Sequence, residues 1–234
     1  MELSGVVPLP VSVVANPAVA FLPLAAATPL TRLVRTILGA VTEPGRVVVA
    51  AAEPLVADVR AILASEELAS VSVVAVGGAG SRADCLRAAL DCLRRAAFST
   101  SHVLVHDIGR PLASADLVMR VVAGMRDGGA VVMPILAVTD SVKAVDVRGS
   151  VIVTVDRSVL RAVQYPRGFT VGALSGLLAR GTPGEFDEIA AAVGADVPIA
   201  FVDGDPDAFH AELPQDAEFI EAIIASRSSD PGGV

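Results

Sequence analysis

The chain has 234 residues, of which 53% are hydrophobic, 19% charged and 3% aromatic. This composition excludes a disordered chain and is sufficient for the core of one large domain. The formal net charge of −8 argues against a nucleic-acid-binding protein, and the low aromatic content argues against surfaces on which bases stack.

The N-terminal segment is the first feature that needs an interpretation, because residues 3–31 carry no charge. Prolines at positions 8, 10, 17 and 23 would break a membrane-spanning helix. Glu2 is the only charged side chain before this stretch and does not suit the basic start of a secretory signal. We therefore expect a buried strand and an irregular loop, and neither a membrane segment nor an export signal.

Short β-branched runs alternate with amphipathic helical patterns in the first 138 residues. The strands are predicted at 46–51, 71–76, 102–106 and 129–138. One helix is predicted to begin at Glu53. Three others are predicted to begin after Thr28, Ser81 and Ser114, whose hydroxyl side chains can cap the first turn. Such alternation predicts an α/β fold with a mostly parallel sheet and helices on both faces.

The two cysteines, Cys85 and Cys92, fall in the third of these predicted helices. Seven residues of helix place their Cα atoms roughly 10 Å apart, whereas a disulfide needs less than about 7 Å. We expect reduced thiols in a cytoplasmic protein.

The pattern changes after residue 138. Residues 138–169 hold short strand patterns joined at Arg148–Gly149, which predicts a β-hairpin arm off the main sheet. Beyond the arm we expect helices at 170–180, 185–194 and 215–226, a strand at 198–203 and a strand-like stretch at 208–213. No linker divides the chain, so we expect one domain over residues 1–227 and a disordered tail over 228–234.

Three polar groups follow predicted strands, where ligands bind in open parallel sheets, and the third, Val138–Lys143 together with Thr154–Phe169, lies on the arm. Gly77–Arg82 (GGAGSR) precedes a helix whose N-terminus favours an anion, although a plain strand-to-helix turn explains it equally well. In the segment HDIGRP, Asp107 could hold Mg²⁺ and Arg110 a phosphate, with a local Asp–Arg ion pair as the alternative.

The arm and the histidines give weaker signals. Polar side chains on the arm are ordinary for a solvated hairpin; they are Asp140, Ser141, Lys143, Asp156, Arg157 and Arg167. His102 and His210 lack metal-ligand spacing, so taken alone they are expected to be structural or surface groups.

Taken in order, four segments resemble the motifs of the 2-C-methyl-D-erythritol 4-phosphate cytidylyltransferases of the non-mevalonate isoprenoid pathway. They are VHDIGRP (105–111), VTDSVK (138–143), DRSVLRAVQYPRGF (156–169) and LPQDAEF (213–219). The resemblance implies a Rossmann-like nucleotidyltransferase fold with a protruding β-arm, and a cytoplasmic homodimer formed through that arm. It also implies transfer of CMP from CTP to a sugar-alcohol phosphate, with Mg²⁺ as cofactor and release of pyrophosphate.

The resemblance also assigns roles to individual residues. Asp107 matches the aspartate expected at the metal, and it is the candidate catalytic group. The nucleotide-binding positions are Gly77, Gly78, Arg82 and Cys85, with Cys85 in place of a serine that reads the base. The acceptor-binding positions are Arg110, Ser141, Lys143, Arg157 and His210, with Arg157 reaching the partner subunit's site and His210 in place of a lysine.

The nucleotide side departs from the family pattern. The family's glycine-rich loop supplies backbone N–H groups, one arginine and one lysine to the triphosphate, but this chain has no Gly, Arg or Lys between Gly5 and Arg32. Each charge-assisted contact contributes roughly 1.5–3 kcal/mol. Smaller departures are Tyr165 and Arg167 in place of a threonine and a glutamine, and GEFDE (184–188) in place of an acidic segment.

Three hypotheses follow from the sequence. The first is a working cytidylyltransferase with a divergent loop. The second is a family member that has lost the reaction and acts as a binding, regulatory or dimer-partner module. The third is a transferase with a changed donor or acceptor.

Overall fold

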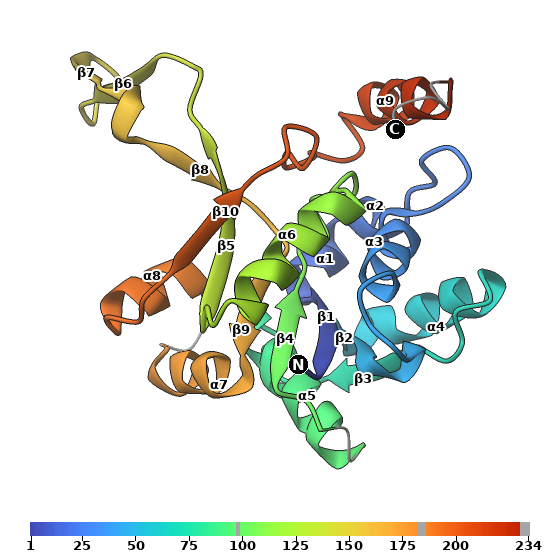
Figure 1. Cartoon of the computed structure of the whole chain (residues 1–234). Helices are drawn as coiled ribbons and strands as arrows, with labels where there is room; N and C mark the ends of the chain where they lie inside the picture. Colours follow the sequence, from blue (N-terminus) through green and yellow to red (C-terminus); the bar gives the residue numbers. More distant parts are fainter. Residues whose placement is uncertain (97–98, 182–185, 230–234) are drawn as a thin grey trace.

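An eight-stranded mixed sheet runs through the centre of the molecule, with helices on both of its faces (Figure 1). This computed structural model describes residues 1–96, 99–181 and 186–229. The strand order is β10–β5–β9–β4–β1–β2–β3, and β8 pairs with β5 beside this path. The strands are β1 (Leu3–Leu9), β2 (Val47–Ala52), β3 (Ser72–Val76), β4 (His102–Val105), β5 (Val131–Ala137), β8 (Arg161–Val163), β9 (Arg167–Thr170) and β10 (Ala200–Asp203).

Strands β1 to β4 pair in parallel, and so do β5 and β10, which confirms the predicted mostly parallel sheet. In β2, Val47, Val49 and Ala51 face one hydrophobic core, whereas Val48 and Ala50 face the other. Because both faces are buried, the strand is a continuous apolar run rather than an alternating one.

The helices divide between the two faces of the sheet. One core contains α3 (Pro29–Leu38), α4 (Val56–Ser65) and α6 (Ala115–Arg126), and the other contains α5 (Arg82–Arg95), α7 (Val171–Arg180) and α8 (Glu188–Gly194). The predicted caps are confirmed: the side chains of Thr28, Ser81 and Ser114 each accept a hydrogen bond from a backbone N–H of the first turn. Short 3₁₀ helices lie at Pro44–Arg46 (η1), Glu53–Leu55 (η2) and Arg157–Val159 (η3).

The N-terminal segment after β1 is more regular than predicted. In place of an irregular loop it forms two short helices, α1 (Val11–Ala15) and α2 (Ala18–Phe21), with Pro10 and Pro17 at their N-caps. A proline lacks the N–H that a helix interior needs, but it is tolerated where a helix begins. The same prolines that exclude one long helix therefore start two short ones.

The predicted arm forms, but it is shorter than 138–169. Its two strands, β6 (Val142–Val145) and β7 (Val151–Val155), form a separate antiparallel hairpin that projects from the main sheet (Figure 1). The turn lies where predicted, with Asp146 Oδ1 accepting from the N–H groups of Arg148 and Ser150. Residues from Arg161 onward return to the main sheet, because β8 pairs with β5 and β9 inserts between β4 and β5.

The C-terminal part contains one wrong prediction. Residues 208–213 form no strand; their backbone instead contacts the loop after β4, where Ala211 N–H donates to the carbonyl of Gly109 (2.8 Å). The last helix is α9 (Ala217–Ser229). The helix predicted over 185–194 begins at Glu188, and residue 185 lies outside the described residues. The predicted tail lies outside them as well from residue 230 onward.

Among the described residues, no helix combines the length and the apolar character that crossing a membrane would require.

Candidate functional site

The strand order reverses between β1 and β4, and ligands of open α/β sheets bind at the carboxyl ends of such strands. A cavity of about 490 Å³ lies at this point. Its walls include Pro8 and Pro10 at the end of β1 and Asp107 after β4, together with residues 210–213. The volume is that of a small-molecule site.

The cavity is poor in positive charge. Its charged lining side chains are Arg82, Asp107 and Glu212, and His210 adds an imidazole. The N-terminal segment contributes mainly apolar side chains, such as Val13 and Val19. The only lysine of the chain, Lys143, lies on the arm.

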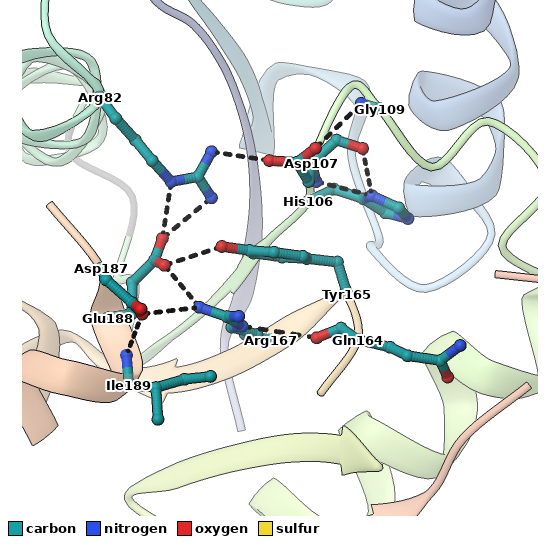
Figure 2. A network of polar contacts seen from close by, with 10 residues as sticks. All are labelled: Arg82, His106, Asp107, Gly109, Gln164, Tyr165, Arg167, Asp187, Glu188 and Ile189. Carbon is teal, nitrogen blue, oxygen red and sulfur yellow. Dashed lines mark hydrogen bonds and ion pairs between the residues drawn. The ribbon is translucent and has the colours of Figure 1, made fainter. Parts of the chain in front are cut away.

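Asp107 is held in place by its own loop. Its Oδ1 accepts the N–H of Gly109 (2.9 Å) and its Oδ2 accepts Arg82 Nη1 (3.1 Å), as Figure 2 shows. Its backbone N–H donates to Nδ1 of His106 (2.8 Å). Burial lowers the pKa of His106 to about 4, so the ring is neutral near pH 7.

Arg82, the first residue of α5, lies between two carboxylates. Its Nε donates to Glu188 Oε1 (2.9 Å), while its Nη1 contacts Asp107. Burial alone would lower the pKa of Arg82, but the nearby Glu188, Tyr165 and Asp107 outweigh it and raise the pKa above its usual value. Arg82 is the only arginine among the described residues of the cavity wall, and it is charged and paired with two carboxylates.

Glu188 is the centre of a buried polar cluster (Figure 2). Its side chain is 1% exposed, and its Oε2 accepts both the hydroxyl of Tyr165 (2.8 Å) and Nη1 of Arg167 (2.6 Å). The guanidinium of Arg167 stacks on the Tyr165 ring at 3.9 Å from the ring centroid. Burial, followed by the charge of Glu188, raises the pKa of Tyr165, which keeps the phenol neutral.

The smaller departures noted in the sequence are therefore one structural unit. Tyr165 and Arg167 lie 23 and 21 residues before Glu188, the last residue of the GEFDE segment, and both side chains donate to its carboxylate. Sequence reasoning did not single out Glu188 as a site residue. The sequence could have pointed to Glu188, because a buried arginine such as Arg167 needs an acidic side chain to pair with.

The other nucleotide-side predictions lie away from the cavity. Gly77 and Gly78 are exposed in the loop after β3 and are not part of the cavity wall. Cys85 lies on the buried face of α5, where burial raises the pKa of its thiol to about 12. Cys85 and Cys92 are both free thiols, as predicted.

The acceptor-side predictions separate into two groups. Arg110 donates to the carbonyl of Ala208 (2.5 Å), and His210 lies so close to Gly109 that a Cβ at that position would overlap the imidazole. Ser141, Lys143 and Arg157 lie in the projecting arm segment (Figure 1). A single chain thus brings Arg82, Asp107 and His210 together at the cavity, with Arg110 nearby.

Comparison with known proteins identifies similar sequences and structures. The model of a family described as 2-C-methyl-D-erythritol 4-phosphate cytidylyltransferase matches residues 14–226. The enzyme of that name from Rhodococcus jostii is 38% identical over 207 residues, which cover 88% of this chain and 86% of the relative. The enzyme of that name from Nocardia farcinica is 36% identical over 210 residues, which cover 90% and 87%.

This chain belongs to the 2-C-methyl-D-erythritol 4-phosphate cytidylyltransferase family. A solved structure of the enzyme of that name from Thermus thermophilus has a TM-score of 0.72 and 28% identity, covering 96% of this chain and 100% of that one. A structure of 4-diphosphocytidyl-2C-methyl-D-erythritol synthase has a TM-score of 0.77 at 23% identity, covering 95% and 98%. The predicted Rossmann-like nucleotidyltransferase fold is confirmed.

The Mg²⁺ that the cytidylyltransferase resemblance implies does not fit the residues present. Both oxygens of Asp107 already accept hydrogen bonds, one of them from a guanidinium. Within the described ranges, no group of three His, Cys, Asp or Glu side chains could hold a metal ion, so any Mg²⁺ would depend on ligands from a substrate and water. Mg²⁺ binding therefore stays a prediction, and the geometry of Asp107 opposes it.

Proposed function

We propose that this member of the cytidylyltransferase family does not transfer CMP and serves as a dimer-forming partner module, located in the cytoplasm. The observation that carries the proposal is the charge of the cavity. Its one arginine is paired with Asp107 and Glu188, and Glu212 adds a further negative charge to the wall. Among the described residues that line the cavity, a nucleoside triphosphate would therefore meet no unpaired arginine and no lysine.

The expected loss of nucleotide affinity is large. Two missing charge-assisted contacts amount to about 3–6 kcal/mol, or roughly 10²–10⁴-fold in affinity. The loss in rate is larger, because the same contacts are strongest in the transition state, where negative charge develops.

The arm supports a role in dimer formation. Its β6–β7 hairpin exposes Val145, Val151, Ile152 and Val153, and the turn between the strands exposes Val147. Apolar side chains gathered on a projecting element are typical of a protein–protein interface. We propose a homodimer in which this arm docks on the partner, carrying Ser141, Lys143 and Arg157 with it.

A second candidate is the family reaction itself, CMP transfer from CTP to 2-C-methyl-D-erythritol 4-phosphate. It is favoured by the 38% identity to the Rhodococcus jostii enzyme and by the presence of Asp107, Arg110 and Lys143. In this case cations from outside the N-terminal segment would have to bind the triphosphate.

One experiment separates the two candidates. Isothermal titration with CTP and Mg²⁺, followed in the same sample by a pyrophosphate-release assay with methylerythritol phosphate, is expected to show neither binding at millimolar CTP nor turnover. The Rhodococcus jostii enzyme, treated in the same way, is the positive control. The missing contacts predict a rate more than about a hundredfold below that of the control. Turnover within about a hundredfold of the control would therefore establish the second candidate.

The arm can be tested independently of nucleotide. We expect the 23.8 kDa chain to sediment as a dimer in analytical ultracentrifugation, and Ile152→Asp to shift it to a monomer. Val193→Asp is the matched control, because Val193 on α8 is also 67% exposed but lies off the arm. At about 50 µM even a weakly associating dimer is populated. A wild-type protein that is monomeric at this concentration would contradict the proposed dimer.

A further inference from the structure

The two oxygens of Asp107 have different partners. Oδ1 accepts a backbone N–H from its own loop, and Oδ2 accepts Arg82 Nη1 at 3.1 Å. Mg²⁺ and Mn²⁺ bind carboxylate oxygens directly and need room for a further shell of oxygen ligands, usually several of them waters. A divalent ion bound at Oδ2 would therefore either displace the Arg82 guanidinium or lie directly beside its positive charge.

Arg82 is held firmly from the opposite side. Its Nε and Nη2 both lie 2.9 Å from Glu188 Oε1, and its side chain is only 16% exposed. Moving this guanidinium away would leave Glu188 short of one positive partner inside the protein. Breaking a buried ion pair in this way is strongly unfavourable.

Two further guanidinium groups lie near Arg82, around the ring of Tyr165. Arg167 stacks on the Tyr165 ring, Arg82 lies 5.1 Å from the centroid of that ring, and Arg110 lies 6.0 Å from it. Three guanidinium groups thus gather around one phenol next to Asp107. Arg82 and Arg167 are paired with Glu188, and Arg110 donates to backbone carbonyls.

We propose that Arg82 is the resident cation of this site and occupies the position at Asp107 that a divalent metal would need. Asp107 then binds no divalent cation at millimolar concentration, and any ligand of the cavity binds with an affinity that a chelator does not change. The inference concerns only the charge at Asp107 and does not depend on the proposed loss of CMP transfer.

The test uses the full-length protein and Mn²⁺ followed by electron paramagnetic resonance, in which bound Mn²⁺ loses its sharp six-line signal. The wild type is expected to leave the signal of 1 mM Mn²⁺ unchanged. Arg82→Gln removes the guanidinium and frees the carboxylates of Asp107 and Glu188. This variant is expected to bind Mn²⁺ at least tenfold more tightly, and Asp107→Asn added to it is expected to abolish the gain.

Two further variants keep the test decisive. Arg94→Gln is the matched control, because it also frees a carboxylate, that of Asp91, but at an exposed ion pair. If Arg82→Gln fails to fold, Arg82→Met replaces it, because it keeps most of the side-chain length and removes the positive charge.

Two results would overturn the proposal. The first is Mn²⁺ binding by the wild type that Asp107→Asn removes. The second is a folded Arg82 variant that binds Mn²⁺ no better than the wild type or Arg94→Gln. Because the readout is metal binding, neither result is confused with the presence or absence of CTP turnover.

Discussion

Replacing Glu188 with alanine is expected to lower the free energy of unfolding by about 3–5 kcal/mol, the usual cost of removing one partner from a buried ion pair. Arg82 and Arg167 would lose the carboxylate between them, and the Tyr165 hydroxyl would lose its acceptor. The exposed Asp187, 3.7 Å from Arg167, is too far and too solvated to replace it. Urea unfolding of the wild type and the variant measures the difference.

Two companion variants show whether burial is the cause. Asp91→Ala removes a carboxylate from the exposed pair with Arg94 and is expected to cost less than about 1 kcal/mol. Glu188→Gln keeps the shape and an acceptor oxygen, so its cost is expected to fall between the other two. A Glu188→Ala variant as stable as Asp91→Ala would show that the cluster contributes little to stability.

The second large effect is a pH dependence that originates at His106. In the folded protein burial lowers the pKa of His106 to about 4, whereas an unfolded histidine has a pKa of about 6.5. Below pH 6.5 the unfolded chain therefore binds a proton that the folded chain does not. Stability is expected to fall as the pH drops from about 6.5 to about 4, by about 3 kcal/mol in total.

His106→Asn isolates this contribution. The amide oxygen of asparagine can still accept the N–H of Asp107, as Nδ1 of His106 does, but it takes up no proton. Urea unfolding at pH 7 and pH 4.5 is expected to show that the wild type loses about 2–3 kcal/mol more than the variant over this interval. Parallel losses in the two proteins would assign the acid sensitivity to other groups.

The parts of the fold that were predicted correctly depend on local chemistry. The caps at Thr28, Ser81 and Ser114 involve a side chain and a backbone N–H three residues away, so the sequence contains both partners. The buried strands are equally local, because a run such as Val47–Ala52 is apolar throughout when both of its faces are covered.

The predictions that failed depend on pairing between distant segments. Strand β9 pairs with β4 and with β5, more than 30 residues away. A strand pattern in one segment does not say which partner it will find, so Arg161–Thr170 looked like the end of the arm. Residues 208–213 failed for the same reason, because their backbone partner is the loop at Gly109.

The sequence by itself determined the family of this protein and the lack of Gly, Arg and Lys between Gly5 and Arg32, because motifs and missing residues can be read in a linear order. Only the tertiary structure decided what the remaining arginine of the cavity does. Arg82 is 25 residues from Asp107 and 106 residues from Glu188, and no local pattern links them. Folding brings the three side chains into contact, and burial strengthens the electrostatic interaction of Arg82 with the two carboxylates.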